Sequence, residues 1–359
     1  MSFLGRLFGA GATGSRAPGG ASASVGARAA AGPTGPGASP AFPAPAVPSG
    51  SSPGAPPAPP APPAPAPAAT PATPPAARRR TAVRANAGSN LVADLRSAWS
   101  AASGQASVEL RPEGGAAGPL DSKIGGEPYL PPGQAWPTLG ANGPDLFLLA
   151  QLNFGQLPPL AGFPARGLLQ FFISGDDTHG MDYRDPVGGP GHLVLYHPDL
   201  PTGAVSAAAP PSGARPDLSR AVEYMDVPFS VAGGVRLTGR AASQPMPPGD
   251  FRFESAFARF LASDEGADVA ERLRRGGSVD LRLAFASKGH RLGGYPRLPL
   301  SDPRVGHHLS RFTTLLLQLD SDESAGIVWG EGGAAGFFIE PERLAARDFS
   351  RVLYSWDCP

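Results

Sequence analysis

The sequence predicts a β-rich α+β domain behind a disordered leader. Short apolar runs separated by turn residues outnumber the helical patterns and do not alternate regularly with them, which disfavours a doubly wound parallel sheet. Three motifs also occur twice, in the same order and at a nearly constant spacing. The domain is therefore expected to be one pseudo-two-fold roll built from two related halves, at about 120–175 and 290–340.

Residues 1–80 differ in composition from the rest of the chain. They hold 19 of the 45 prolines, no Asp, Glu or Lys, and six Arg as their only charged residues. Such a segment buries too little apolar surface to offset the entropy of ordering. The Ala-Pro and Pro-Pro units at 41–77 favour an extended polyproline conformation. We expect a disordered Pro/Ala/Gly-rich leader at 1–80 and the folded domain at 90–359.

The leader opens with a short amphipathic pattern. Phe3, Leu4, Leu7 and Phe8 would share one face of a helix. The run is too short for a signal peptide, and Arg6 interrupts it. Two interpretations stay open, a frayed terminus or a weak contact with a membrane surface or a partner's groove.

The charge balance argues against a nucleic-acid partner. The chain carries 30 basic and 30 acidic residues, and residues 1–93 hold seven Arg and no acid. The remainder therefore has 30−7=23 basic against 30 acidic residues, a net charge of −7. Binding to a phosphate backbone needs a basic face instead. Cys358 is the single cysteine, which excludes an internal disulfide and fits a reducing compartment such as the cytoplasm.

Hydrophobic periodicity places the secondary structure along the domain. A helix is expected from Leu91 with Asn90 as its N-cap, followed by helices at about 251–262 and 264–275 and a short one from Pro341. Strands are expected in nine apolar runs, at 146–152, 168–174, 192–196, 222–228, 279–285, 313–319, 327–329, 336–339 and 352–356.

The internal repeat is the strongest signal in the sequence. KIGGEPYLP at 123–131 matches RLGGYPRLP at 291–299, LLAQLN at 148–153 matches LLLQLD at 315–320, and FFI at 171–173 matches FFI at 337–339. The offsets are 168, 167 and 166 residues, far above the period of a solenoid repeat. Each half is expected to supply a Gly-Gly-x-Pro turn, a strand that carries Gln and a strand that carries Phe-Phe-Ile.

These segments also resemble a known family. SKIGGEPYLPPGQAWP at 122–137, GLLQFFISGDDTHGMDYRDP at 167–186 and FFIEPERLAARDFSRVLYSWDC at 337–358 are similar in order and wording to the YwqG-like family, a bacterial domain family of unknown function. The resemblance covers roughly 122–358. It implies a β-rich, roll-like fold and a cytosolic bacterial protein, and it implies no activity. One departure is Glu331, where the family pattern favours Asp after Trp-Gly.

The repeated motifs supply a candidate cleft between the two halves. A Gln inside an apolar strand must be hydrogen-bonded if it is buried, so the two equivalent glutamines either pair with each other or line a cleft. The Gly-Gly pairs either offer backbone N–H groups to an anion or form turns with positive φ. The candidate cleft comprises Gln151, Gln318, Asp320, Asp322, Trp329, Glu331, Gly125, Gly126, Gly293 and Gly294.

Two acidic stretches raise the question of a metal. The first contains Asp176, Asp177, His179, Asp182 and Asp185, and hard cations bind oxygen-rich loops of this kind. The second contains Asp320, Asp322 and Glu323. Neither has the spacing of an EF-hand or a zinc site, and turns capped by Asp side chains explain both stretches. No metal and no cofactor is expected.

Two functions remain open at the level of sequence. The first is a non-enzymatic binding or protein-interaction module with an unknown protein or small-molecule partner, because no nucleophile–base set is present. Cys358 has no local His, and no Gly-x-Ser-x-Gly or Walker pattern occurs. The alternative is a hydrolase that uses Asp320, Asp322 and Glu331 as paired acids, which requires that they converge on one concave site beside Trp329.

Overall fold

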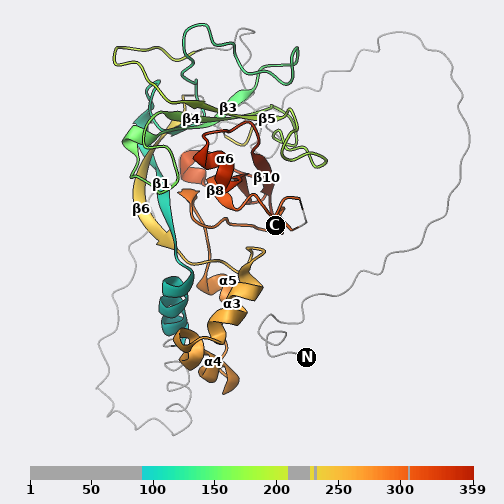
Figure 1. Ribbon diagram of the computed structural model, residues 1–359. Helices are drawn as coiled ribbons and strands as arrows, with labels where there is room; N and C mark the ends of the chain where they lie inside the picture. The colour runs from blue at the N-terminus through green and yellow to red at the C-terminus, as the bar shows by residue number, and fades with distance from the viewer. Residues whose placement is uncertain (1–90, 209–226, 230–232, 306–307) are drawn as a thin grey trace, which may run out of the picture. The chain divides into compact units, whose positions relative to one another are not determined.

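A computed structural model describes residues 91–208, 227–229, 233–305 and 308–359 (Figure 1). These residues form a β-rich fold dominated by one antiparallel sheet of ten strands, in the order β10-β9-β8-β7-β1-β6-β2-β3-β4-β5. The strands are β1 (Gln105–Ala116), β2 (Lys123–Ile124), β3 (Phe147–Asn153), β4 (Leu168–Ile173), β5 (His192–His197), β6 (Val235–Gln244), β7 (His290–Gly293), β8 (Thr314–Asp320), β9 (Ala334–Ile339) and β10 (Leu353–Asp357). The β-rich class expected from the sequence is confirmed.

The sheet is centred on the long antiparallel pair of β1 and β6. β7, β8, β9 and β10 follow on the side of β1, and β2, β3, β4 and β5 follow on the side of β6. The pairing registers on the two sides correspond, since Lys123 lies opposite Gln151 and Arg291 lies opposite Gln318. β3 and β8 also carry a register irregularity at matching positions, between 148 and 150 and between 315 and 317.

The curled sheet brings its two edge strands together around the core. His192 on β5 bonds through Nε2 to the carbonyl oxygen of Val352, 2.9 Å away, just before β10. Its ring lies 5.3 Å from that of Tyr354 on β10. Inside the curl, the rings of Phe171 and Phe337 meet edge to face at 4.9 Å, and both are fully buried. Contact between these rings joins the two sides of the sheet in one core.

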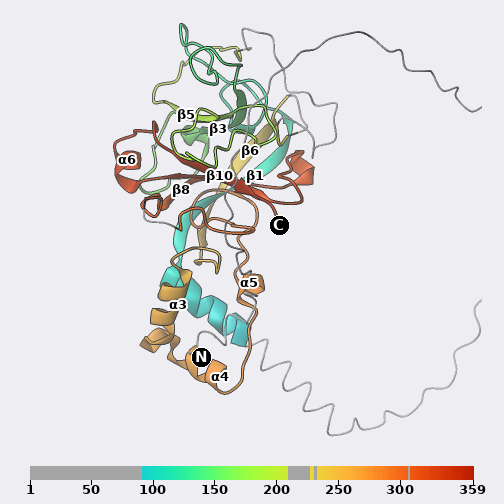
Figure 2. The same ribbon diagram turned by 90° about the vertical axis from the view of Figure 1, so that its right-hand side faces the viewer.

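A helical cluster lies beyond one end of β1 and β6 (Figures 1 and 2). It contains a helix at 91–103, α3 (Phe253–Leu261), η3 (Asp264–Gly266), α4 (Ala267–Arg274) and α5 (Leu281–Ala284). Trp99 is 2 % exposed, and its ring packs within 5.7 Å of three Phe rings on α3. Its indole N–H donates to the Met246 carbonyl oxygen, which ties the cluster to the end of β6.

The structure corrects the expected strand at 279–285. Asp280 accepts a hydrogen bond from the Leu283 N–H and thereby caps the short helix α5. Leu281 and Ala284 are buried three residues apart, whereas Leu283 is 73 % exposed. The alternation of apolar residues was therefore misleading, because one of the apolar side chains faces solvent.

Of the other elements expected from the sequence, some are confirmed, one is wrong and one lies mostly outside the described residues. The helices at 91–103, α3, α4 and α6 (Pro341–Ala345) lie where the periodicity placed them. The run at 327–329 makes only isolated bridges through Ile327, so the expected strand there is wrong. Most of the run at 222–228 lies outside the described residues. The two longest strands, β1 and β6, were not predicted.

Candidate functional site

Both Gly-Gly pairs form turns with left-handed backbone. The φ angles of Gly125, Gly126, Gly293 and Gly294 lie between 65° and 74°, a range that L side chains adopt at a cost. The Gly125 N–H donates to the Leu149 carbonyl oxygen at 2.9 Å, so this group is already used by the fold. The geometry fits the turn interpretation of these glycines.

Gln151 is fully buried and holds the first Gly-Gly-x-Pro loop against β3. Its Nε2 donates to the carbonyl oxygens of Pro119 and Asp121, at 2.8 and 2.9 Å. Its Oε1 accepts from the Tyr129 N–H at 3.2 Å and from Nε2 of Gln170 at 2.8 Å. All four hydrogen-bonding positions of the amide are therefore occupied within its own half.

Gln318 holds the second Gly-Gly-x-Pro loop against β8 in the same way. Its Nε2 donates to the carbonyl oxygens of Ser287 and Gly289, at 3.0 and 2.7 Å. Its Oε1 accepts from the Arg297 N–H at 2.5 Å. The two glutamines bond to neither each other nor a shared partner, so each acts as an anchor between a strand and its loop.

Asp320 is also engaged by the fold. It is 5 % exposed, and its Oδ1 lies 2.6 Å from NH1 of Arg297 while its Oδ2 accepts from the Gly289 N–H at 2.7 Å. His290 is 2 % exposed and uses Nδ1 to accept from the Asp320 N–H at 3.1 Å. Burial lowers the pKa of His290, which keeps the ring neutral.

The remaining acids of the candidate cleft do not converge on a reactive group. Asp322 caps the turn η4 (Glu323–Ala325), and its Oδ2 is 3.5 Å from Nε2 of His290. Glu331 is exposed. Ser321 offers no nucleophile for a His–Asp pair, because its hydroxyl donates to the Gly333 carbonyl oxygen at 2.9 Å. Asp320 and Asp322 are thus each engaged by the fold, whereas Glu331 is exposed to solvent.

Trp329 is fully buried, so it forms no exposed wall of a cleft. Its ring lies 5.7 Å from that of His179 and 5.9 Å from that of Trp356. These ring contacts place Trp329 against His179 of the acidic loop at 174–191.

The acidic loop at 174–191 is built from aspartate-capped turns. Asp176 accepts hydrogen bonds from the Ser174 hydroxyl, the Thr178 hydroxyl and N–H, and the Gly180 N–H. Partial burial opposes ionisation of Asp176, but these hydrogen bonds hold its pKa below the ordinary value. Asp182 and Asp185 cap the next turns through backbone N–H groups. Within the described part of the chain, no three His, Cys, Asp or Glu side chains are grouped to hold a metal.

The loop also covers the outer edge of β10. The Tyr354 N–H donates to the Pro186 carbonyl oxygen and its hydroxyl donates to that of His179, both at 2.9 Å. Trp356 donates from its indole to the Thr178 carbonyl oxygen at 2.6 Å and from its backbone N–H to Sδ of Met181 at 3.4 Å. His179 adopts a φ of 49°, which is uncommon outside glycine. The loop is thus pinned to the last strand and is well placed to present a rigid surface.

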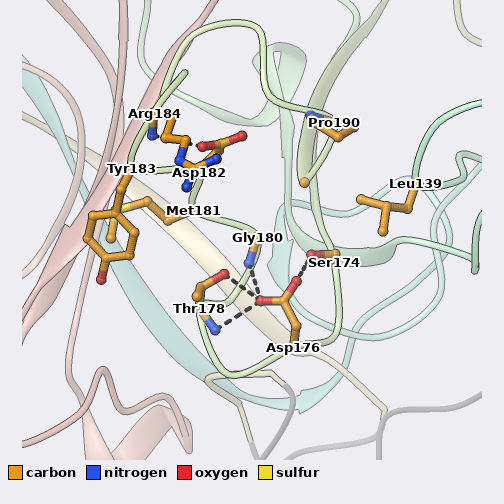
Figure 3. A pocket seen from close by; sticks show the side chains of 11 residues that line it. Leu139, Ser174, Asp176, Thr178, Gly180, Met181, Asp182, Tyr183, Arg184 and Pro190 are labelled. Carbon is orange, nitrogen blue, oxygen red and sulfur yellow. Dashed lines mark hydrogen bonds between the residues drawn. The ribbon is translucent and has the colours of Figure 1, made fainter. Parts of the chain in front are cut away.

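A hollow of about 420 Å³ opens on this loop (Figure 3). Asp176 and Gly180 are among its lining residues, and Met181 and Leu139 add apolar side chains to the lining. Tyr183 stands at the rim with 76 % of its surface exposed, next to the exposed Arg184. An exposed aromatic side chain on a pinned loop beside a concave surface is typical of a binding site.

The fold and this loop define a β-rich domain with a candidate binding surface and no recognisable catalytic set in the described residues. The sequence of residues 122–358 matches the family model described as "Domain of unknown function (DUF1963)". The chain belongs to this family, in agreement with the resemblance to the YwqG-like family. None of the curated proteins compared with the chain matches it. Among the described residues, no helix is long and apolar enough to cross a membrane.

Sequence reasoning found the loop but missed the surface it presents. The density of Asp drew attention to a metal, whereas Tyr183 and Arg184 sit between those acids in the run MDYRDP. A single Tyr in a polar loop carries no periodic signal, and its exposure became visible only in the structure. The hydrogen bond between Met181 and Trp356 on β10 joins residues 175 positions apart, and no local sequence pattern predicts it.

Proposed function

We propose that this domain is a non-enzymatic binding module, and that it contacts its partner through the hollow at 174–191. The observation that carries the proposal is Tyr183, a residue that is 76 % exposed on a loop pinned to β10. Exposed aromatics on rigid supports contribute contact area at a small entropic cost, since little has to be ordered on binding. The neighbouring Arg184 can add a charged contact.

The alternative, a hydrolase with paired acids, has weaker support. A general acid or base must reach a substrate proton, and Asp320 is held between Arg297 and Gly289 at 5 % exposure. Asp322 retains partial exposure but serves as a turn cap. If the domain hydrolysed an ester, a phosphoester or a glycoside, the activity would have to disappear in the variant Asp322→Asn.

The binding proposal predicts a position-specific cross-link. A photo-reactive residue placed at Arg184 in the full-length chain should give a discrete cross-linked product in cells, because this position is exposed at the rim of the hollow. The same residue at Arg166, which is also exposed but lies outside the hollow, should give none. Adding Tyr183→Ala should abolish the product at position 184. Equal products at both positions, or a product that persists in Tyr183→Ala, would contradict the proposal.

We also propose that the two halves, about 120–175 and 290–340, arose by duplication. The matching registers of β2 with β3 and β7 with β8 support this. So do the buried cations at 123 and 291, each bonded to backbone carbonyl oxygens of its own loop. Burial lowers the pKa of Lys123 to about 8 and that of Arg291 to about 10.

The boundary between leader and domain is a further proposal, together with a cytoplasmic location. We propose that residues 1–80 are dispensable for folding and that Phe3, Leu4, Leu7 and Phe8 supply at most a weak contact with a membrane or partner.

A chain that begins at Ala82 tests the boundary. Its free energy of unfolding should differ from that of the full chain by less than about 1 kcal/mol, as for changes away from packed features. Thermal and denaturant unfolding of the two chains measures this. A large drop in melting temperature would show that the leader packs on the domain, and a changed fractionation of the shortened chain would assign the leader a targeting role.

A further inference from the structure

The two ends of the ten-stranded sheet meet without pairing as strands. β5 and β10 are the outermost strands, and among the described residues no backbone hydrogen bond joins one to the other. A hollow of about 270 Å³ is lined by His192 and Val194 of β5 and by Phe349 and Val352 of the segment before β10. We call this junction of β5 with residues 349–352 and β10 the seam. Its closure depends on side-chain contacts.

His192 makes a polar contact across the seam. Its Nε2 lies 2.9 Å from the Val352 carbonyl oxygen, and a carbonyl oxygen only accepts hydrogen bonds, so Nε2 carries the proton. In the neutral ring Nδ1 then holds a lone pair. Nδ1 is buried and has no hydrogen-bond partner among the described residues. The closed seam therefore fits the neutral ring, because protonation would turn Nδ1 into a second donor without an acceptor.

The neighbours of the ring within the sheet are apolar or neutral. Ile173 on β4 lies opposite His192 in the sheet, and the rings of Phe337 on β9 and Tyr354 on β10 lie 6.4 and 5.3 Å away. The Tyr354 hydroxyl donates to the His179 carbonyl oxygen, and burial raises the pKa of this hydroxyl well above its ordinary value. It therefore stays neutral and offers no charge to a protonated His192.

The segments on either side of the seam each carry an exposed charged group. Asp185, in the loop before β5, attracts a proton to His192, but it also accepts a hydrogen bond from the Gly188 N–H. Arg351 lies in the segment before β10. Burial outweighs the attraction by Asp185 and lowers the pKa of His192. A charged ring is thus more stable in an open, hydrated seam than in the closed one.

From this geometry we propose that His192 is a pH-sensitive latch, whose neutral ring holds the seam closed and whose protonation releases it. Opening gives the new N–H to water. Because the pKa of the ring is lower in the closed seam than in water, its contribution to closure is complete above about pH 6.5 and is lost as the pH falls below that value. The latch does not rest on the binding role proposed for Tyr183.

Hydrogen exchange of the full-length chain at pH 7.5 and pH 5.5 tests this proposal. The reporter is the Tyr354 N–H, which donates to the Pro186 carbonyl oxygen in the loop before β5. Its protection, corrected for the intrinsic pH dependence of exchange, should fall by up to about tenfold at the lower pH. His192→Gln keeps an amide that can donate to Val352 but does not titrate, so the fall should disappear.

His197→Gln is the matched control. His197 lies on the same strand and is also buried, but its Nε2 bonds to Oε1 of Gln170 and not across the seam. Burial lowers its pKa as well. The fall in protection of the Tyr354 N–H should therefore persist in His197→Gln.

Three results would overturn the proposal. The first is equal protection of the Tyr354 N–H at the two pH values in the wild-type chain, which needs no variant. The second is a fall that persists in His192→Gln, and the third is a fall that His197→Gln removes equally well. Melting temperatures at pH 7.5 verify that the variants fold, and His192→Asn replaces His192→Gln if that chain is unfolded.

Discussion

Replacing Arg304 with methionine is expected to lower the free energy of unfolding by about 3–5 kcal/mol. The Arg304 side chain is fully buried and bonds to two buried carboxylates, Asp250 and Asp302, at 2.8 to 2.9 Å. It also lies over the ring of Phe338, 4.7 Å from the centroid. Methionine fills a similar volume but leaves both carboxylates without this partner in a site that water does not reach. Urea unfolding of the two chains measures the difference.

The exposed pair of Arg166 and Asp199 provides the matched control. Arg166→Met removes a bond of 3.0 Å between side chains that are at least 75 % exposed, so its effect should stay below about 1 kcal/mol. If Arg304→Met lowered the free energy of unfolding no more than Arg166→Met does, the buried network would not be an anchor of the fold.

Acid should weaken the same network. Burial opposes ionisation of Asp250, but Arg252 and Arg304 hold its pKa below the ordinary value. A carboxyl whose pKa is lowered by folding contributes stability that is complete above its unfolded pKa of about 3.9 and is lost as the pH falls through the folded value. Unfolding measured from pH 6 down to pH 2 should show this loss, and Arg304→Met should make it smaller.

Replacing either Gln151 or Gln318 with leucine should lower the free energy of unfolding by about 2–4 kcal/mol. Gln151→Leu leaves two carbonyl oxygens, one N–H and one amide of Gln170 without their partner. Gln318→Leu leaves two carbonyl oxygens and the Arg297 N–H. Each buried group left unpaired costs roughly 1–3 kcal/mol, and partial relaxation of the loops reduces the sum.

Gln134→Leu is the control for both variants, because this partly exposed side chain lies outside the sheet and should change stability by only about 0.5 kcal/mol. Thermal and urea unfolding compare the three chains. Retained stability in Gln318→Leu would contradict the anchoring role and return Gln318 to the candidate cleft.

The sequence predicted the outer strands well and the central pair not at all. β3, β4, β8 and β9 are buried apolar runs with a strong local signal, as in LLLQL and FFI. β1 instead reads QASVELRPEGGA, with Pro112 inside it, and β6 reads VRLTGRAASQ. These two strands are held by pairing between residues that are 119 to 139 positions apart, and a local pattern does not encode such pairing.

The sequence named the residues of the candidate cleft, but none of them lines the hollow at 174–191. A Gln at equivalent places in two apolar strands had to find partners, but its partners are backbone groups of loops that local patterns do not position. Likewise, the position of Asp320 at the end of a repeated strand did not reveal that Arg297 and Gly289 already occupy its carboxylate. No sequence pattern singled out Tyr183, and only its exposure in the structure identified it as a candidate binding residue.

We propose that the partner binds at the loop at 174–191 and not at Asp322 or Glu331. The cross-linking experiment at position 184 tests this when the variant Tyr183→Ala is compared with a variant that combines Asp322→Asn and Glu331→Gln. We expect the cross-linked product to disappear in Tyr183→Ala and to be retained in the acid variant. A product that survives Tyr183→Ala and is lost with the two acids would contradict it.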